Sequence, residues 1–180
     1  MPLPRVSVGQ VVHRAANGPA FLAVCVGLAA LGSLTALFPV TTVLVPATLL
    51  VPARWRLVAA ACALGSAIGA TALAGMFHRL GWSQVTERFP ELAASDTWHQ
   101  TVNWVSDYGA WALCAVAATP LPQTPALLFF AIARQDYAAV FAAMLAGKLL
   151  KYGVIAWLTA RFPERVRGGL GSLWHRLWGG

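Results

Sequence analysis

The chain has 180 residues, of which 58% are hydrophobic and only 11% are charged, and its mean hydropathy is +0.65. Soluble domains carry about a quarter charged residues, so this composition excludes a soluble domain and predicts an integral membrane protein. The net charge is +7, but the basic residues stand at the ends of apolar runs, which favours the membrane and its anionic lipid headgroups over nucleic acid as partners.

Residues 1–14 form a short basic tail, and the run from Pro19 to Phe38 predicts the first membrane helix. Twenty helical residues rise about 30 Å, which is one hydrocarbon thickness. The apolar run exceeds the usual length of a signal-peptide core, so we expect no cleavage. Three cysteines lie far apart inside apolar runs, which predicts packing residues rather than a disulfide framework: Cys25, Cys62 and Cys114.

Prolines interrupt the next apolar segment, from Pro39 to Pro52. The segment is too short to cross a membrane as a helix, too broken for a straight helix and too hydrophobic for a surface loop. Irregular backbone at membrane depth persists only where protein or water satisfies its polar groups. We therefore expect a re-entrant hairpin. Thr41 and Thr42 within it are candidates for binding an anion or, equally, for capping the broken helix ends.

Leu57–Phe77 is the second predicted span, and its small residues at i, i+4, Gly65 and Gly69, predict close packing on another helix. The polar stretch from His78 to Asp107 follows. Its spaced tryptophans predict short helices at the headgroup level.

Tyr108–Ala133 contains the second broken segment. Gln123 and Thr124 lie between its prolines and are, like Thr41 and Thr42, candidates for binding an anion or, equally, for capping the broken helix ends. Tyr137–Ala160 is the last predicted long helix. The chain thus divides into the basic tail, a membrane domain over residues 15–163, and a basic amphipathic tail over residues 164–180 that we expect on the membrane surface.

The two halves follow a similar plan. In each, a proline-broken apolar segment leads to an arginine, Arg54 or Arg134, and then to an alanine-rich helix with a glycine near its middle, Gly65 or Gly147. Both arginines join the candidate anion ligands. An odd number of crossings between the halves would make this an inverted repeat, a common transporter design.

Lys148 and Lys151 are the sharpest functional signal. Lys148 lies 11 residues into the last helix, about 16 Å from its start and close to the bilayer midplane. A lysine there costs about 2.5–3.5 kcal/mol on insertion scales. The i, i+3 spacing places both lysines on one face, which should meet the protein interior or a wet cavity and suits a lipid phosphate. The alternative is that both side chains snorkel to the interface.

No catalytic motif accompanies these residues. The four histidines are scattered without metal-ligand spacing, and there is no glycine-rich phosphate loop. We therefore expect no enzyme activity, no metal and no cofactor.

In order and spacing, these motifs resemble the DedA family of membrane proteins (VTT-domain, SNARE-associated Golgi proteins), nearest its YqaA-like branch. The resemblance covers roughly residues 32–163. It rests on the Pro39–Pro52 segment, on Gly65, Gly69 and Gly75 leading to His78-Arg79-Leu80-Gly81, on Thr119-Pro120-Leu121-Pro122, and on Gly147-Lys148 with Lys151-Tyr152.

The resemblance implies an all-α polytopic bundle with two re-entrant hairpins meeting from opposite faces, and a role in lipid movement across membranes. Family members often carry an acid in the first hairpin and a basic residue after the second proline motif. Thr42 and Thr124 stand roughly at those positions here. Proton coupling through a hairpin carboxylate is therefore not expected of this chain.

The sequence hypothesis is a multi-pass protein of the inner cell membrane that moves an anionic lipid, a phospholipid or a polyprenyl phosphate, across the bilayer. The alternative is a non-transporting membrane scaffold or envelope-assembly factor. A membrane-embedded enzyme comes third, because the chain supplies no converging nucleophile, base or metal ligands. Whether the chain forms a homo-oligomer is left open.

Overall fold

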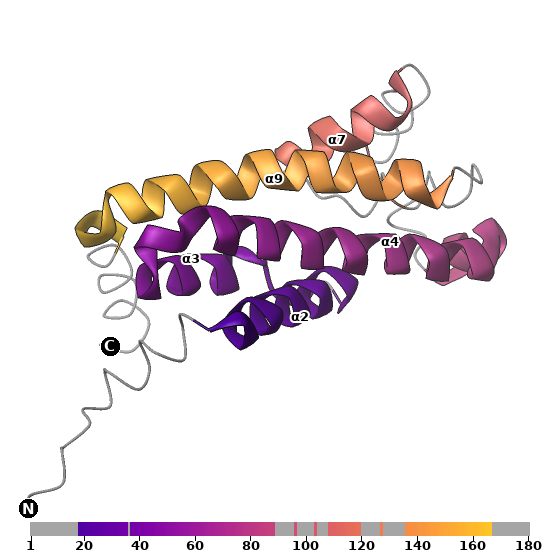
Figure 1. Cartoon of the computed structure of the whole chain (residues 1–180). Coiled ribbons are helices and arrows are strands. Elements are labelled where there is room, and N and C mark those ends of the chain that lie inside the picture. Colours follow the sequence, from indigo (N-terminus) through magenta and orange to yellow (C-terminus); the bar gives the residue numbers. More distant parts are fainter. Residues whose placement is uncertain are drawn as a thin grey trace, which may run out of the picture.

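The computed structural model describes residues 18–35, 37–88, 108–119 and 136–166, with the single residues 96, 103 and 127. Its elements are the helices α2 (Pro19–Thr35), α3 (Thr41–Leu50), α4 (Trp55–Arg88), α7 (Ala110–Ala118) and α9 (Tyr137–Arg161), with a 3-10 helix η1 (Pro52–Arg54). The predicted helical class is confirmed. Figure 1 shows α4 and α9 side by side along the length of the molecule, with α2 and α3 beside α4 and with α7 on α9.

Among the residues that the structure describes, two helices are long and apolar enough to cross a membrane: Pro52–Arg79, with 28 residues, and Tyr137–Arg161, with 25. At about 1.5 Å per residue they rise about 42 and 37 Å, more than the roughly 30 Å of a hydrocarbon core. They match the second predicted span and the last predicted long helix, whereas the first predicted membrane helix, Pro19–Phe38, is the shorter apolar helix α2. The second span was predicted to end at Phe77 with separate short helices after it, but α4 continues as one helix from Trp55 to Arg88. The sequence between Phe77 and Arg88 contains no proline to interrupt the helix.

The first proline-broken segment is more regular than expected. α3 forms a ten-residue helix with Pro46 inside it, where the sequence predicted a segment too broken for a straight helix. A proline removes one backbone donor, and this loss still leaves the rest of α3 bonded as a helix. Pro39 and Pro52 lie just outside the helix instead. α2 ends at Thr35, three residues before the expected Phe38. Phe38 itself precedes Pro39, and a residue in that position avoids the α conformation.

Glycines set how closely the helices approach. A Cβ atom added to Gly65 would lie 2.8 Å from the Val26 carbonyl carbon and still closer to its oxygen, and one added to Gly69 would meet Ala30 in the same way. The predicted close packing at Gly65 and Gly69 is therefore confirmed. The matching order of these pairs also shows that α2 and α4 run parallel.

The second half repeats this arrangement. A Cβ atom at Gly147 would overlap the Cys114 carbonyl oxygen, and four residues later Lys151 meets Thr119, so α7 and α9 also run parallel. The two pairs run in opposite directions. Tyr137, at the start of α9, lines a pocket with Gly75, whereas Tyr152 lies against Ser66 nearer the start of α4.

The buried apolar residues in the described part of the chain form two clusters. One joins α2 and α3 to the first part of α4 and the last part of α9, with Leu44, Val58 and Ala156 among its members. The other joins α7 and Leu127 to the middle of α4 and the first part of α9, with Met144 among its members. Ser66 on α4 and Lys148 on α9 fall between the two clusters along both long helices.

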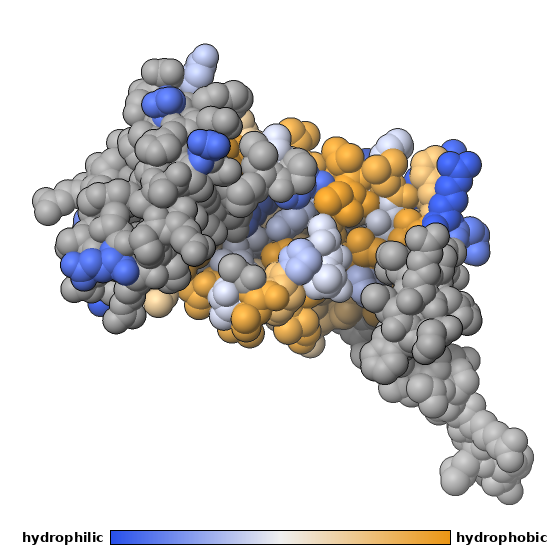
Figure 2. Space-filling view, turned by 180° about the vertical axis from the view of Figure 1, so that it is seen from behind, coloured by the Kyte–Doolittle hydropathy of each residue, from blue (hydrophilic) through white to orange (hydrophobic). Residues whose placement is uncertain are grey.

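The outer surface is apolar where the long helices are exposed. Figure 2 shows hydrophobic residues across the middle of the molecule and hydrophilic residues toward its ends. Exposed side chains on the described helices include large hydrophobic ones that water would not favour: Val24, Leu28, Leu57, Leu64, Ile68, Leu150, Val154 and Trp157. This surface fits contact with lipid.

Candidate functional site

Lys148 lies in the middle of the bundle. Ser66 stands 14 residues after Pro52 and 13 before Arg79, and Lys148 stands 11 after Tyr137 and 13 before Arg161. The Lys148 side chain is only 2% exposed. The expectation that it faces the protein interior is confirmed, and the snorkelling alternative does not describe this side chain.

Three neutral oxygens surround the Lys148 ammonium. Its Nζ donates to Ser33 Oγ at 3.1 Å, to the Ser66 carbonyl at 3.3 Å and to Ser66 Oγ. Ser33 belongs to α2 and Ser66 to α4, so one side chain of α9 joins three helices. Ser66 Oγ also bonds to the Tyr152 hydroxyl at 3.3 Å, which extends the network by one turn of α9.

These hydrogen bonds leave Lys148 unable to bind a phosphate directly. An ammonium has three donors, and here three acceptors take them, so no donor is left over for a phosphate in this conformation. The acceptors carry no formal charge, however, so the positive charge is solvated but not cancelled. In a low-dielectric interior such a charge acts over a longer range than in water. The site can therefore attract an anion without bonding to it directly.

Lys151 has different surroundings. Its side chain is half-buried, and Nζ donates to the Thr119 carbonyl at 2.8 Å. Thr119 is the C-cap of α7, where carbonyl groups have no partner within the helix and favour a cation. Thr119 also begins the second proline motif. Lys151 therefore connects α9 to the entry of that motif, and it is the more accessible of the two lysines.

These are the only two lysines in the chain. An amine-specific reagent consequently reports on Lys148, Lys151 and the N-terminus alone. The burial difference predicts that Lys151 reacts faster than Lys148 with a small membrane-permeant amine reagent, measured by peptide mass spectrometry in detergent. Equal rates at both positions would contradict the burial of Lys148.

The threonines of the first broken segment do not join Lys148 through any described hydrogen bond. Thr41 begins α3 and is half-buried, while Thr42 is exposed and its Oγ1 donates to the Pro39 carbonyl at 2.8 Å. Thr42 thus makes a local contact with the backbone, while the first turn of α3 has no side-chain cap hydrogen bond. Arg54 lies half-buried in η1, at the end of the bundle where α4 begins. Gln123, Thr124 and Arg134 lie outside the described residues.

Sequence reasoning missed the residues that solvate Lys148. Ser33 and Ser66 are buried at 5% and 0% exposure, and Tyr152 at 6%. The signal for Ser66 was its place between Gly65 and Gly69, but a serine there looks like one more small packing residue. Among the described residues, no three His, Cys, Asp or Glu side chains come together to form a metal site.

Comparison with known proteins adds no relative to this description: no protein-family model, curated protein or solved structure matches the chain. The resemblance to the DedA family therefore stays a prediction from the motifs.

Proposed function

We propose that this chain is a multi-pass protein of the inner cell membrane that moves an anionic lipid, a phospholipid or a polyprenyl phosphate, across the bilayer. The observation that carries the proposal is the Lys148 charge, held halfway along both candidate spans and solvated by uncharged oxygens. Intramembrane ionisable residues are costly and are functional sites by default. The protein acts as a transporter or scramblase rather than as an enzyme.

The helix directions support a paired architecture for this function. α2 runs parallel to α4, α7 runs parallel to α9, and the two pairs are antiparallel. In the proposal these pairs are inverted repeats, and the two proline-broken segments enter the membrane from opposite faces as re-entrant hairpins. Short re-entrant elements leave less hydrocarbon between the two surfaces, which lowers the barrier for a charged headgroup.

The two lysines have separate roles in this mechanism. Lys148 supplies the positive potential at the midplane while it holds α2, α4 and α9 together. Lys151 exchanges its bond to the Thr119 carbonyl for a bond to the lipid phosphate, because a charge-assisted pair is stronger than a bond to a neutral carbonyl.

Transport in liposomes tests the proposal. We expect wild-type protein to move a fluorescent anionic phospholipid between leaflets, and we expect Lys151→Gln to slow this movement about tenfold or more, the equivalent of the roughly 1.5–3 kcal/mol of a charged hydrogen bond. Lys151→Arg should retain most of the rate. Arg161→Gln, which removes an exposed cation from the end of the same helix, serves as the control. Equal rates for wild type and Lys151→Gln would remove Lys151 from the mechanism.

A non-transporting scaffold is the second candidate, and one observation favours it: three protein oxygens already engage Lys148, as expected of a purely structural link between helices. Under this alternative the wild-type protein moves no lipid in vesicles and instead copurifies with one partner in fixed ratio. Lipid movement by wild type that Lys151→Gln abolishes would exclude it.

If α4 spans the membrane, its two ends should be accessible from opposite sides. Ala53 and Glu87 are exposed residues near opposite ends of α4. In a variant whose three native cysteines are replaced by alanine, a cysteine at position 53 should react with a membrane-impermeant maleimide from one side only, and a cysteine at position 87 from the other. Labelling of both positions from the same side of sealed vesicles would contradict a membrane-spanning α4.

A further inference from the structure

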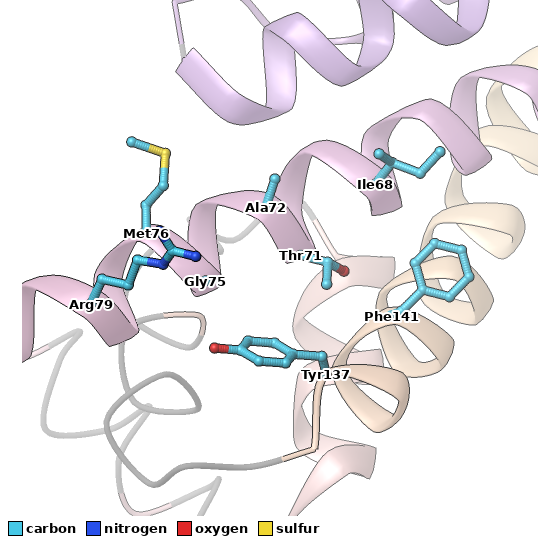
Figure 3. Close-up of a pocket in the computed structure, with 8 residues that line it drawn as sticks. All are labelled: Ile68, Thr71, Ala72, Gly75, Met76, Arg79, Tyr137 and Phe141. Atoms are coloured by element: carbon cyan, nitrogen blue, oxygen red, sulfur yellow. The ribbon is translucent and has the colours of Figure 1, made fainter.

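A groove lies on the outer surface where α4 meets the start of α9. Its volume is about 580 Å³, within the roughly 300–1,000 Å³ of small-molecule sites. Figure 3 shows Arg79 and Met76 on α4 above the ring of Tyr137, with Phe141 beside Ile68 at the far end. Gly75 and Ala72, on α4, have no side chain long enough to fill the space between α4 and α9.

The groove changes character along its length. The deep end is apolar, with Ile68, Ala72 and Phe141, and the hydroxyl of Thr71 there already donates to the Ala67 carbonyl at 2.9 Å. The outer end carries the exposed guanidinium of Arg79 and the partly exposed ring of Tyr137. His78 packs edge-to-face on that ring, with 6.1 Å between the ring centroids.

The length of the groove matches one membrane leaflet. Ile68 lies two residues beyond the central Ser66, and Arg79 ends the apolar span eleven residues later. Eleven helical residues rise about 16 Å, close to half of the roughly 30 Å hydrocarbon core. An acyl chain lying in the groove would therefore reach from the headgroup level to the middle of the membrane.

We propose that this groove binds one anionic phospholipid of the leaflet at the Arg79 end. Its phosphate bonds to the Arg79 guanidinium and the Tyr137 hydroxyl, and one acyl chain lies over Met76, Ala72 and Ile68. Charge complementarity selects the headgroup, and the satisfied Thr71 hydroxyl leaves the deep end suited to hydrocarbon. The inference depends on the membrane placement but not on transport, because a lipid held at this site need not move.

The test measures lipid retention rather than lipid movement. Purified protein in a neutral detergent is mixed with equal amounts of phosphatidylglycerol and phosphatidylcholine of identical acyl chains, and native mass spectrometry counts the lipids that remain bound. Wild type should retain phosphatidylglycerol preferentially. Arg79→Gln should lower that preference about fivefold, the effect of about one basic group near an anionic headgroup.

Two further variants complete the test. Gly75→Leu should reduce retention of both lipids, because its side chain enters space where a Cβ atom meets only Tyr137 at 3.9 Å. Arg56→Gln removes an exposed arginine at the opposite end of α4 and should change neither value. An unchanged lipid preference in Arg79→Gln would overturn the proposal. The same mass spectra report the oligomeric state. A dimeric wild type together with a monomeric Gly75→Leu protein that retains lipid unchanged would also overturn the proposal, because the groove would then hold a second copy of the protein.

Discussion

We expect Gly65→Leu to separate α2 from α4 and to lower the free energy of unfolding by about 3 kcal/mol or more, at the upper end of overpacking effects. The obstacle is the backbone of Val26, whose carbonyl group lies where the new Cβ atom would stand. A backbone carbonyl cannot rotate aside as a flexible side chain does, so the whole helix must shift. That shift would also move Ser33 away from Lys148.

The control uses the same substitution on the facing helix. Gly27 lies on the exposed side of α2, and a Cβ atom there has nothing within 4 Å, so Gly27→Leu should leave stability nearly unchanged. Gly147→Leu should resemble Gly65→Leu, because its Cβ atom would overlap the Cys114 carbonyl oxygen in the other half. Unfolding in detergent, followed by tryptophan fluorescence, measures all three. Equal stability of Gly65→Leu and Gly27→Leu would refute the close α2–α4 contact.

These helix contacts were only partly readable from the sequence. The bounds of α9 were predicted almost to the residue, because Asp136 caps its first turn through the Ala138 amide and an apolar run follows without interruption. The i, i+4 spacing of Gly65 and Gly69 predicted close helix packing. Neither feature names the partner helix, since small residues pack equally well against several alanine-rich neighbours.

The candidate site was predicted through its charge but not through its acceptors. A lysine near the centre of an apolar helix is recognisable because its position is costly. The serines that solvate it come from helices 82 and 115 residues away along the chain. Such pairing depends on the directions in which α2, α4 and α9 run, which no local pattern encodes. The continuation of α3 through Pro46 was missed for a different reason, because proline lowers helix stability without forbidding a helix.

The hydrogen bonds around Lys148 predict that Ser66→Ala and Lys148→Met change stability by different amounts. Ser66→Ala removes the Oγ acceptor from a buried ammonium, so it should destabilise the fold by about 1.5–3 kcal/mol, the range for hydrogen bonds to charged groups. Lys148→Met removes the charge itself and fills the same space with an apolar chain. Replacing buried charged groups by apolar ones of similar volume is often neutral or stabilising, so Lys148→Met should cost less than Ser66→Ala.

The double variant decides whether the two side chains act together. In the Lys148→Met background, Ser66→Ala should cost less than in the wild type, because only its bonds to Ser33 and Tyr152 are then lost. The difference gives a coupling energy of about 1.5 kcal/mol or more between Ser66 and Lys148. Thr48→Ala is the matched control, because buried Thr48 donates to the Leu44 carbonyl of its own helix and should cost the same in both backgrounds. Equal costs of Ser66→Ala with and without Lys148 would show that no such coupling exists. A stable Lys148→Met protein that has lost lipid movement would assign the buried charge to transport, since its fold would not require that charge.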